Sequence, residues 1–272
     1  MQHQEFESPD ELRDAIKCFW YNINHSDEIR SRFEVVPDGY VEIIFYFGSL
    51  YNLAENENLQ TLPSPFMMGL LDQPAVFYSQ NCLQIIGIRC YPWTVFDLLG
   101  LPSGKGGVQT FRHPIAALQS ALNNHICNGR INEAIEELKD YFIQSRSGNA
   151  TGKMLLKAGM AMRDAHGTMP VNQVAAAAHA TVRTLERNFK QSSGYTVKDV
   201  SALMRFEQVR NQLWLDPETN LAGLAHKLGY TDQSHLSREF KRYSGTTPAA
   251  FARKGKKEKQ ALTGDFVAFI QS

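Results

Sequence analysis

Residues 221–251 read LAGLAHKLGYTDQSHLSREFKRYSGTTPAAF, and this stretch decides how the C-terminal half of the chain folds. Residues 171–200, VNQVAAAAHATVRTLERNFKQSSGYTVKDV, repeat its pattern, so that Arg187 aligns with Arg238. Similarity at a fixed offset indicates a duplicated supersecondary unit. Each copy predicts a short apolar helix, a tight turn and a basic helix, which is the layout of a helix-turn-helix motif.

The basic helix of each copy carries a polar stripe beside its apolar face. In the first copy the stripe consists of Arg183, Glu186, Arg187 and Lys190, which recur at helical spacing. In the major groove an arginine can bridge O6 and N7 of guanine, and a glutamate can accept from a cytosine amine. A single stripe is also compatible with a solvated face on which Glu186 pairs with Lys190. The second copy favours DNA binding.

In the second copy the corresponding stripe is Ser234, Ser237, Arg238 and Lys241, and Gln233 lies at the start of the helix. Recognition helices commonly contact bases near their start. Lys241 and Arg242 are suited to phosphate contacts, which position a protein without specifying a sequence. Between the copies, residues 198–215 predict a helix of roughly 30 Å. Successive major-groove faces lie about 34 Å apart, so one rigid helix can hold both basic helices on one face of a duplex.

The segment GYTDQSHLSREFKRYSGTTPAAF resembles the second helix-turn-helix of AraC/XylS-type transcriptional regulators, and the first copy matches more loosely. The resemblance covers about residues 150–255. It implies two helix-turn-helix units joined by a long helix, on which Arg205 matches the family's arginine. Carried onto matching positions, the base-contacting residues are Arg183, Glu186, Arg187, Gln233, Ser234, Ser237 and Arg238. We expect Lys190, Lys241 and Arg242 to contact phosphates.

Charge divides the chain in the same place. Residues 1–149 carry 10 Lys and Arg against 18 Asp and Glu, a net charge of −8. Residues 150–272 carry 18 against 10, a net charge of +8. Such a division suggests that the second half meets a polyanion. The charge changes sign at the polar segment 146–152, the predicted linker between a domain of residues 1–145 and a DNA-binding domain of residues 153–255, followed by a tail of residues 256–272.

The first half has the pattern of an α+β domain. Residues 33–37, 40–47, 75–79 and 83–90 are apolar, strand-like runs separated by Gly and Pro. They predict a small β-barrel or sandwich, flanked by helices over 92–99, 114–126 and 132–143. The runs at 36–45 and 86–92 resemble the β-rich sensor domain of one branch of the same regulators. That resemblance implies a domain that senses a small-molecule effector or mediates dimerisation.

Partners beyond DNA are less defined by the sequence. Ile131, Ile135, Leu138 and Phe142 form a stripe that fits either a homodimer seam or packing on the protein's own barrel. Arg89, in an apolar strand, is a candidate to receive the acid group of an effector, or to pair with Glu42. We expect RNA polymerase as a further partner.

An enzyme and a protein-binding barrel are the rival functions. Cys18, Cys82, Cys90 and Cys127 lack the Pro-Cys-His context of a repair nucleophile, and no GxSxG, HExxH or phosphate loop occurs. We therefore expect that the protein is not an enzyme and binds neither a cofactor nor a metal. We also expect the four cysteines to be buried free thiols and not to form disulfides. Equivalent arginines in both repeats argue against protein binding alone. The N-terminus does not read as a signal peptide, and no apolar stretch spans a membrane, so a bacterial cytoplasmic, nucleoid-associated protein is expected.

Overall fold

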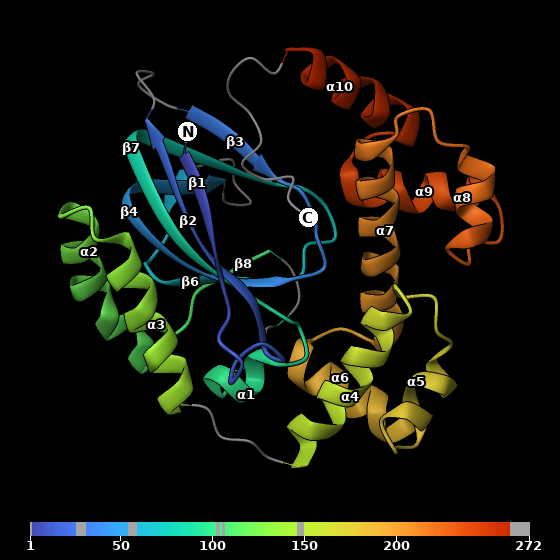
Figure 1. The fold of residues 1–272 in the computed structure, drawn as a ribbon, viewed down its shortest axis with the longest axis horizontal. Coiled ribbons are helices and arrows are strands. Elements are labelled where there is room, and N and C mark those ends of the chain that lie inside the picture. The colour runs from blue at the N-terminus through green and yellow to red at the C-terminus, as the bar shows by residue number, and fades with distance from the viewer. Residues whose placement is uncertain are drawn as a thin grey trace.

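The first half of the chain is a curled antiparallel sheet and the second half is entirely helical, as predicted (Figure 1). The computed structural model describes residues 2–25, 31–53, 59–101, 104, 107–145 and 150–261. Helices α2 and α3 cover one side of the sheet, and α7 runs along another (Figure 1).

Eight antiparallel strands form one continuous sheet within the described residues. They are β1 (Gln2–Glu7), β2 (Ile16–His25), β3 (Ser31–Val35), β4 (Val41–Leu53), β5 (Leu59–Thr61), β6 (Phe66–Met68), β7 (Ala75–Cys90) and β8 (Val108–Gln109). Their order is β1-β2-β7-β4-β6-β8, with β3 paired to β7 and β5 paired to β4. The long strands β4 and β7 are the centre of the sheet, because each pairs with several neighbours.

The structure contains one long strand, β7, where the sequence predicts two strands at 75–79 and 83–90. The chain continues through Asn81, where φ is 59°, and the ladder with β4 shifts register between Phe47 and Ser49. Gly48 in that shift has φ of 122°. A bulge of this kind bends a pair of strands without ending it. The sequence prediction also lacked β1 and β2, whose residues join the same sheet.

The helices follow the predicted order. They are α1 (Val95–Leu99), the 3-10 helix η1 (Pro114–Leu118), α2 (Gln119–Cys127), α3 (Ile131–Ser145), α4 (Ala150–Asp164), α5 (Val171–Ala177), α6 (Val182–Ser193), α7 (Val197–Leu215), α8 (Leu221–Lys227), α9 (Gln233–Ser244) and α10 (Pro248–Ala261). Helix α4 begins inside the predicted linker, and α10 continues into the predicted tail. Residues 146–149 and 262–272 lie outside the described residues, and the domain division itself stays a prediction.

The apolar stripe of α3 packs inside the protein. Ile135, Leu138 and Phe142 are completely buried, and Ile131 is half-buried against the same core. Helix α3 contacts α2, and the Phe142 ring lies 6.4 Å from that of Phe19 on β2. The alternative of packing on its own barrel is therefore what the structure shows. Three of the four side chains of the suggested homodimer seam therefore offer no surface to a partner, and a homodimer stays a prediction.

The two halves of the chain are docked against each other through several buried contacts. The Tyr195 hydroxyl donates to the Leu70 carbonyl at 2.5 Å, and the Ser192 hydroxyl donates to the Trp93 carbonyl at 3.4 Å. Arg210 on α7 is 1% exposed and donates from Nη1 to the Pro37 carbonyl at 3.1 Å. Helix α7 is thus hydrogen-bonded to the turn between β3 and β4.

Gly159 on α4 provides a test of this docking. A Cβ atom at this position would lie 1.9 Å from the indole of Trp93, a side chain that is 2% exposed. Alanine favours a helix over glycine by about 1 kcal/mol, yet the clash reverses that gain. We expect Gly159→Ala to lower the melting temperature. Gly223→Ala on α8 is the matched control, since its nearest neighbour lies at 3.8 Å, and it should be neutral or stabilising.

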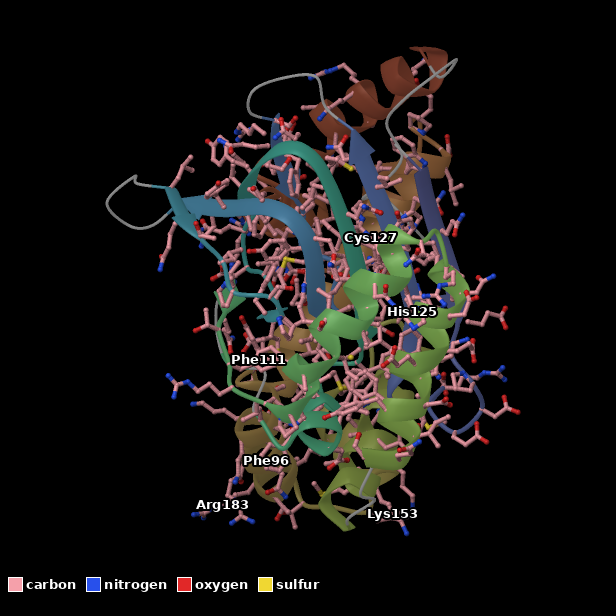
Figure 2. The ribbon with its side chains drawn as sticks, turned by 90° about the vertical axis from the view of Figure 1, so that its left-hand side faces the viewer. Phe96, Phe111, His125, Cys127, Lys153 and Arg183 are labelled. Carbon is pink, nitrogen blue, oxygen red and sulfur yellow. The ribbon has the colours of Figure 1, made fainter. Side chains whose placement is uncertain are left out.

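The four cysteines are free thiols in the described structure. Cys18 and Cys90 are buried, and burial raises the pKa of Cys18 to about 11. Cys82 is half-buried, whereas Cys127 is exposed on α2, contrary to the expectation that all four are buried (Figure 2). Among the described residues no helix is long and apolar enough to cross a membrane.

Candidate nucleic-acid interface

Helices α5 and α6 form the first helix-turn-helix unit. Val174, Leu185 and Phe189 are completely buried between them. The Thr181 hydroxyl accepts from the backbone N–H of Thr184 at 3.2 Å, as expected of an N-cap residue. Helix α6 ends at Gly194, where φ is 77°, a value that favours glycine.

Helices α8 and α9 repeat this construction. The Asn220 side chain accepts from the backbone N–H groups of Ala222 and Gly223, and caps α8. The Asp232 carboxylate caps α9 by accepting from the His235 N–H at 2.8 Å. Gly245 ends α9 with φ of 72°. The two basic helices therefore have matching starts and ends, which confirms the duplicated unit.

The predicted contact residues lie on the outer faces of α6 and α9. Figure 2 shows Arg183 projecting from the rim of the molecule. The exposed members are Arg183, Arg187, Lys190, Gln233, Ser234, Arg238, Lys241 and Arg242, and the half-buried members are Glu186 and Ser237. The basic groups are thus available to a ligand on both helices, while their roles toward DNA stay predictions.

Glu186 differs from the other predicted base-contacting residues. Its carboxylate accepts from the backbone N–H of Val197 at 3.3 Å, at the start of α7. It makes no ion pair with Lys190, so the solvated pair that the sequence allows is not formed in the described structure. This hydrogen bond links α6 to α7. Glu186 can contact a base only if its carboxylate gives up this hydrogen bond or accepts from Val197 and the base together.

Helix α7 joins the two units and has 19 residues, which gives a length of roughly 28 Å. A capping box of Thr196 and Asp199 stabilises its start. At its middle Phe206 packs against Phe240 and Tyr243, with ring centroids 5.2 Å away in both cases. One continuous helix therefore fixes the separation of α6 and α9 (Figure 1).

Arg205 holds the second unit onto α7, a role that the sequence did not assign. It donates to the Gly167 carbonyl at 3.0 Å and lies 3.6 Å from the Glu239 carboxylate. Its guanidinium also lies 5.2 Å from the ring centre of Tyr230, whose hydroxyl donates to Glu239. The partners Gly167, Tyr230 and Glu239 lie far from Arg205 along the chain, so no linear motif predicts that they meet it. The sequence alone therefore identifies only the arginine.

Arg89 lies in the sheet, far along the chain from the basic helices. Its Nε donates to Glu42 at 2.8 Å, and its Nη2 lies 3.5 Å from Asp38. Glu42 is 3% exposed, and burial raises the pKa of its carboxyl. The adjoining apolar slot has a cavity volume of only about 40 Å³. Of the two roles that the sequence allows, the structure contains the pairing with Glu42.

Comparison with known proteins agrees with this geometry. Residues 174–254 match the family model described as a helix-turn-helix domain, and residues 4–107 match a domain of unknown function, DUF6597. No curated protein sequence matches the chain. The family match over residues 174–254, together with the paired basic helices, shows a helix-turn-helix domain in the second half of the chain and supports a DNA-binding transcription regulator. This domain agrees with the resemblance of the sequence to AraC-type regulators.

Solved structures similar to this chain include complete regulators and isolated DNA-binding domains. ToxT from Vibrio cholerae O395 has 14% identity and a TM-score of 0.45, covering 91% of this chain and 99% of its own. The DNA-binding domain of AdpA, in complex with a target DNA, has 21% identity and a TM-score of 0.36, covering 41% and 98%. An AraC-type regulator from Chromobacterium violaceum has 20% identity and a TM-score of 0.36, covering 41% and 95%.

Proposed function

We propose that this protein binds duplex DNA sequence-specifically by placing α6 and α9 in successive major grooves. The observation that carries the proposal is the repetition of one exposed basic face on both helices, with Arg187 and Arg238 at equivalent positions. The 19-residue helix α7 joins the two units, and its length of roughly 28 Å is comparable to one helical turn of DNA. Two contact surfaces at that separation favour DNA over a protein ligand.

Selection of bound sequences from random duplex DNA by the full chain tests the proposal directly. We expect two conserved blocks of base pairs with their centres about 10 base pairs apart, one for each basic helix. Arg187→Ala should erase conservation in one block, and Arg238→Ala should erase it in the other. Recovery of a single block, or of no conserved sequence, would contradict the placement of two helices.

Salt dependence separates phosphate contacts from base contacts. Each phosphate neutralised contributes about −0.9 to the slope of log K against log salt concentration. We expect Lys241→Ala to make that slope shallower by about 1, because the exposed Lys241 lies next to Arg242 at the end of α9. Fluorescence anisotropy over a salt series measures the slope. Lys139→Ala, on α3, is the control and should leave the slope unchanged.

We further propose that the first half regulates this binding in response to a small molecule. The contacts between Arg210 and Pro37 and between Tyr195 and Leu70 support this, since they join the sheet to α7 and to the end of α6. A change in the sheet therefore reaches the helix that positions both DNA-binding units. RNA polymerase is the further partner proposed for such a regulator.

A further inference from the structure

A cavity of about 180 Å³ lies between the two halves of the chain. It is separate from the slot beside Arg89 and from the exposed faces of α6 and α9. Its walls include Lys17, Tyr91 and Trp93 from the first half, and Arg163, Glu207 and Asn211 from the second. A cavity of roughly 150 Å³ accommodates a benzene-sized molecule, so this one has room for a small metabolite.

One side of the cavity is formed by Arg163, together with the rings of Tyr91 and Trp93. Arg163 on α4 donates from Nη1 to the Tyr91 hydroxyl at 2.6 Å and lies 5.0 Å from the centre of that ring. Within the described structure Arg163 has no carboxylate partner. A guanidinium that lines a cavity and has no anionic partner favours the binding of an acid group.

The wall contributed by α7 has the opposite character. Glu207 is half-buried and makes no hydrogen bond or ion pair with any described residue. Burial raises the pKa of its carboxyl to about 7, although the neighbouring Arg210 opposes this change. Asn211 lies one helical turn further along the same wall. A cationic amine beside Glu207 would stabilise the ionised carboxylate and supply the missing donor.

We propose that this cavity binds a small zwitterion, a free amino acid or a close relative, with its acid group on Arg163 and its amine on Glu207. The aromatic walls formed by Tyr91 and Trp93, whose rings stack 5.2 Å apart, suit an apolar side chain. Lys17 also lines the cavity and lies 5.0 Å from the Tyr40 ring centre.

Because both halves supply contacts, the zwitterion stabilises their docked arrangement. A ligand that binds one arrangement more tightly shifts the equilibrium toward it, and the coupling is reciprocal. Glu207 lies on α7, so this linkage extends to the helix that joins the two DNA-binding units. The occupancy of the cavity is independent of the proposed DNA-binding function, whereas the effect on DNA rests on it.

Isothermal titration calorimetry of the full chain, with each of the common amino acids in turn, tests the proposal without DNA. We expect at least one amino acid to bind with a stoichiometry of one. Its deaminated and decarboxylated analogues should bind at least about tenfold more weakly, because each loses one charge-assisted contact. Binding by none of the amino acids, or equal binding by the deaminated acid, would overturn the proposal.

Two variants test which residue binds the acid group of the ligand and which binds its amine. Arg163→Met should weaken binding of the amino acid at least about tenfold. Glu207→Gln should weaken the amino acid to a similar extent but leave the affinity for the deaminated acid nearly unchanged. Arg130→Met, at an exposed arginine, is the matched control and should bind normally. Unaltered binding in both cavity variants refutes the site, and thermal melts confirm that each variant is folded.

The same titrations distinguish this proposal from the proposed function. If the amino acid binds but the chain selects no DNA sequence, the cavity is confirmed and DNA recognition fails. If DNA is selected and no amino acid binds, the cavity proposal alone is refuted.

Discussion

Replacing Arg238 by alanine is expected to weaken binding to the selected DNA site by about 5- to 150-fold, while binding to random DNA changes little. Arg238 is exposed on α9 and forms no ion pair with the described residues, so its guanidinium is available to bridge the O6 and N7 atoms of a guanine. Such a bidentate contact discriminates against other bases by about 1–3 kcal/mol. Random sequences rarely present a guanine at that position and gain little from the arginine.

Competition binding with the selected duplex and with random duplexes of the same length measures this difference. Lys241→Ala is the matched control on the same helix, since it also removes one positive charge. It should weaken specific and random DNA alike, because a phosphate contact is present in every sequence. Equal losses of specific and random binding in both variants would remove the roles assigned to these two residues.

Phe206→Ala is expected to lower the free energy of unfolding of the helical half by about 3–5 kcal/mol. Phe206 is completely buried on α7, and its ring contacts both Phe240 and Tyr243 on α9. Alanine leaves a cavity between the helix that joins the two units and the second basic helix. Because α9 depends on this packing for its position, sequence-specific DNA binding should fall with stability.

Chemical denaturation followed by circular dichroism at 222 nm measures this loss. Leu215→Ala, at the end of the same helix, is the control because Leu215 is 74% exposed. Its substitution should change the free energy of unfolding by less than about 0.5 kcal/mol. A similar loss in both variants would mean that the packing of Phe206 is not what holds α9.

The helices of the second half were predictable because the sequence features that specify them lie only a few residues apart. Thr181 and Asp232 are residue types that favour N-cap positions, and Pro248 suits a first helical turn, so the starts of α6, α9 and α10 are all marked in the sequence. The repeat of apolar positions also fixed which side of α6 and α9 is buried. Periodicity of this kind depends on residues a few positions apart, so a single sequence carries it.

Contacts between distant parts of the chain were not predictable. The bond from Arg210 to Pro37, the association of Arg205 with Glu239, and the bond from Val197 to Glu186 depend on three-dimensional proximity. The stripe at 131–142 shows the same limit, because periodicity identifies a buried face without telling which surface buries it. The sequence likewise did not predict that one strand continues through the bulge near Asn81, where two strands were expected.

The bond between Arg210 and the turn at Pro37 has a consequence for gene control. Since α7 carries both basic helices, a movement of this turn displaces them as a pair and leaves the side chains that face the bases unaltered. An effector acting by this route would change how strongly the protein holds the whole DNA site, and would leave unaltered both the bases that it prefers and the distance between the two blocks. Promoters that carry the same two blocks at the same distance would then respond alike to the same signal.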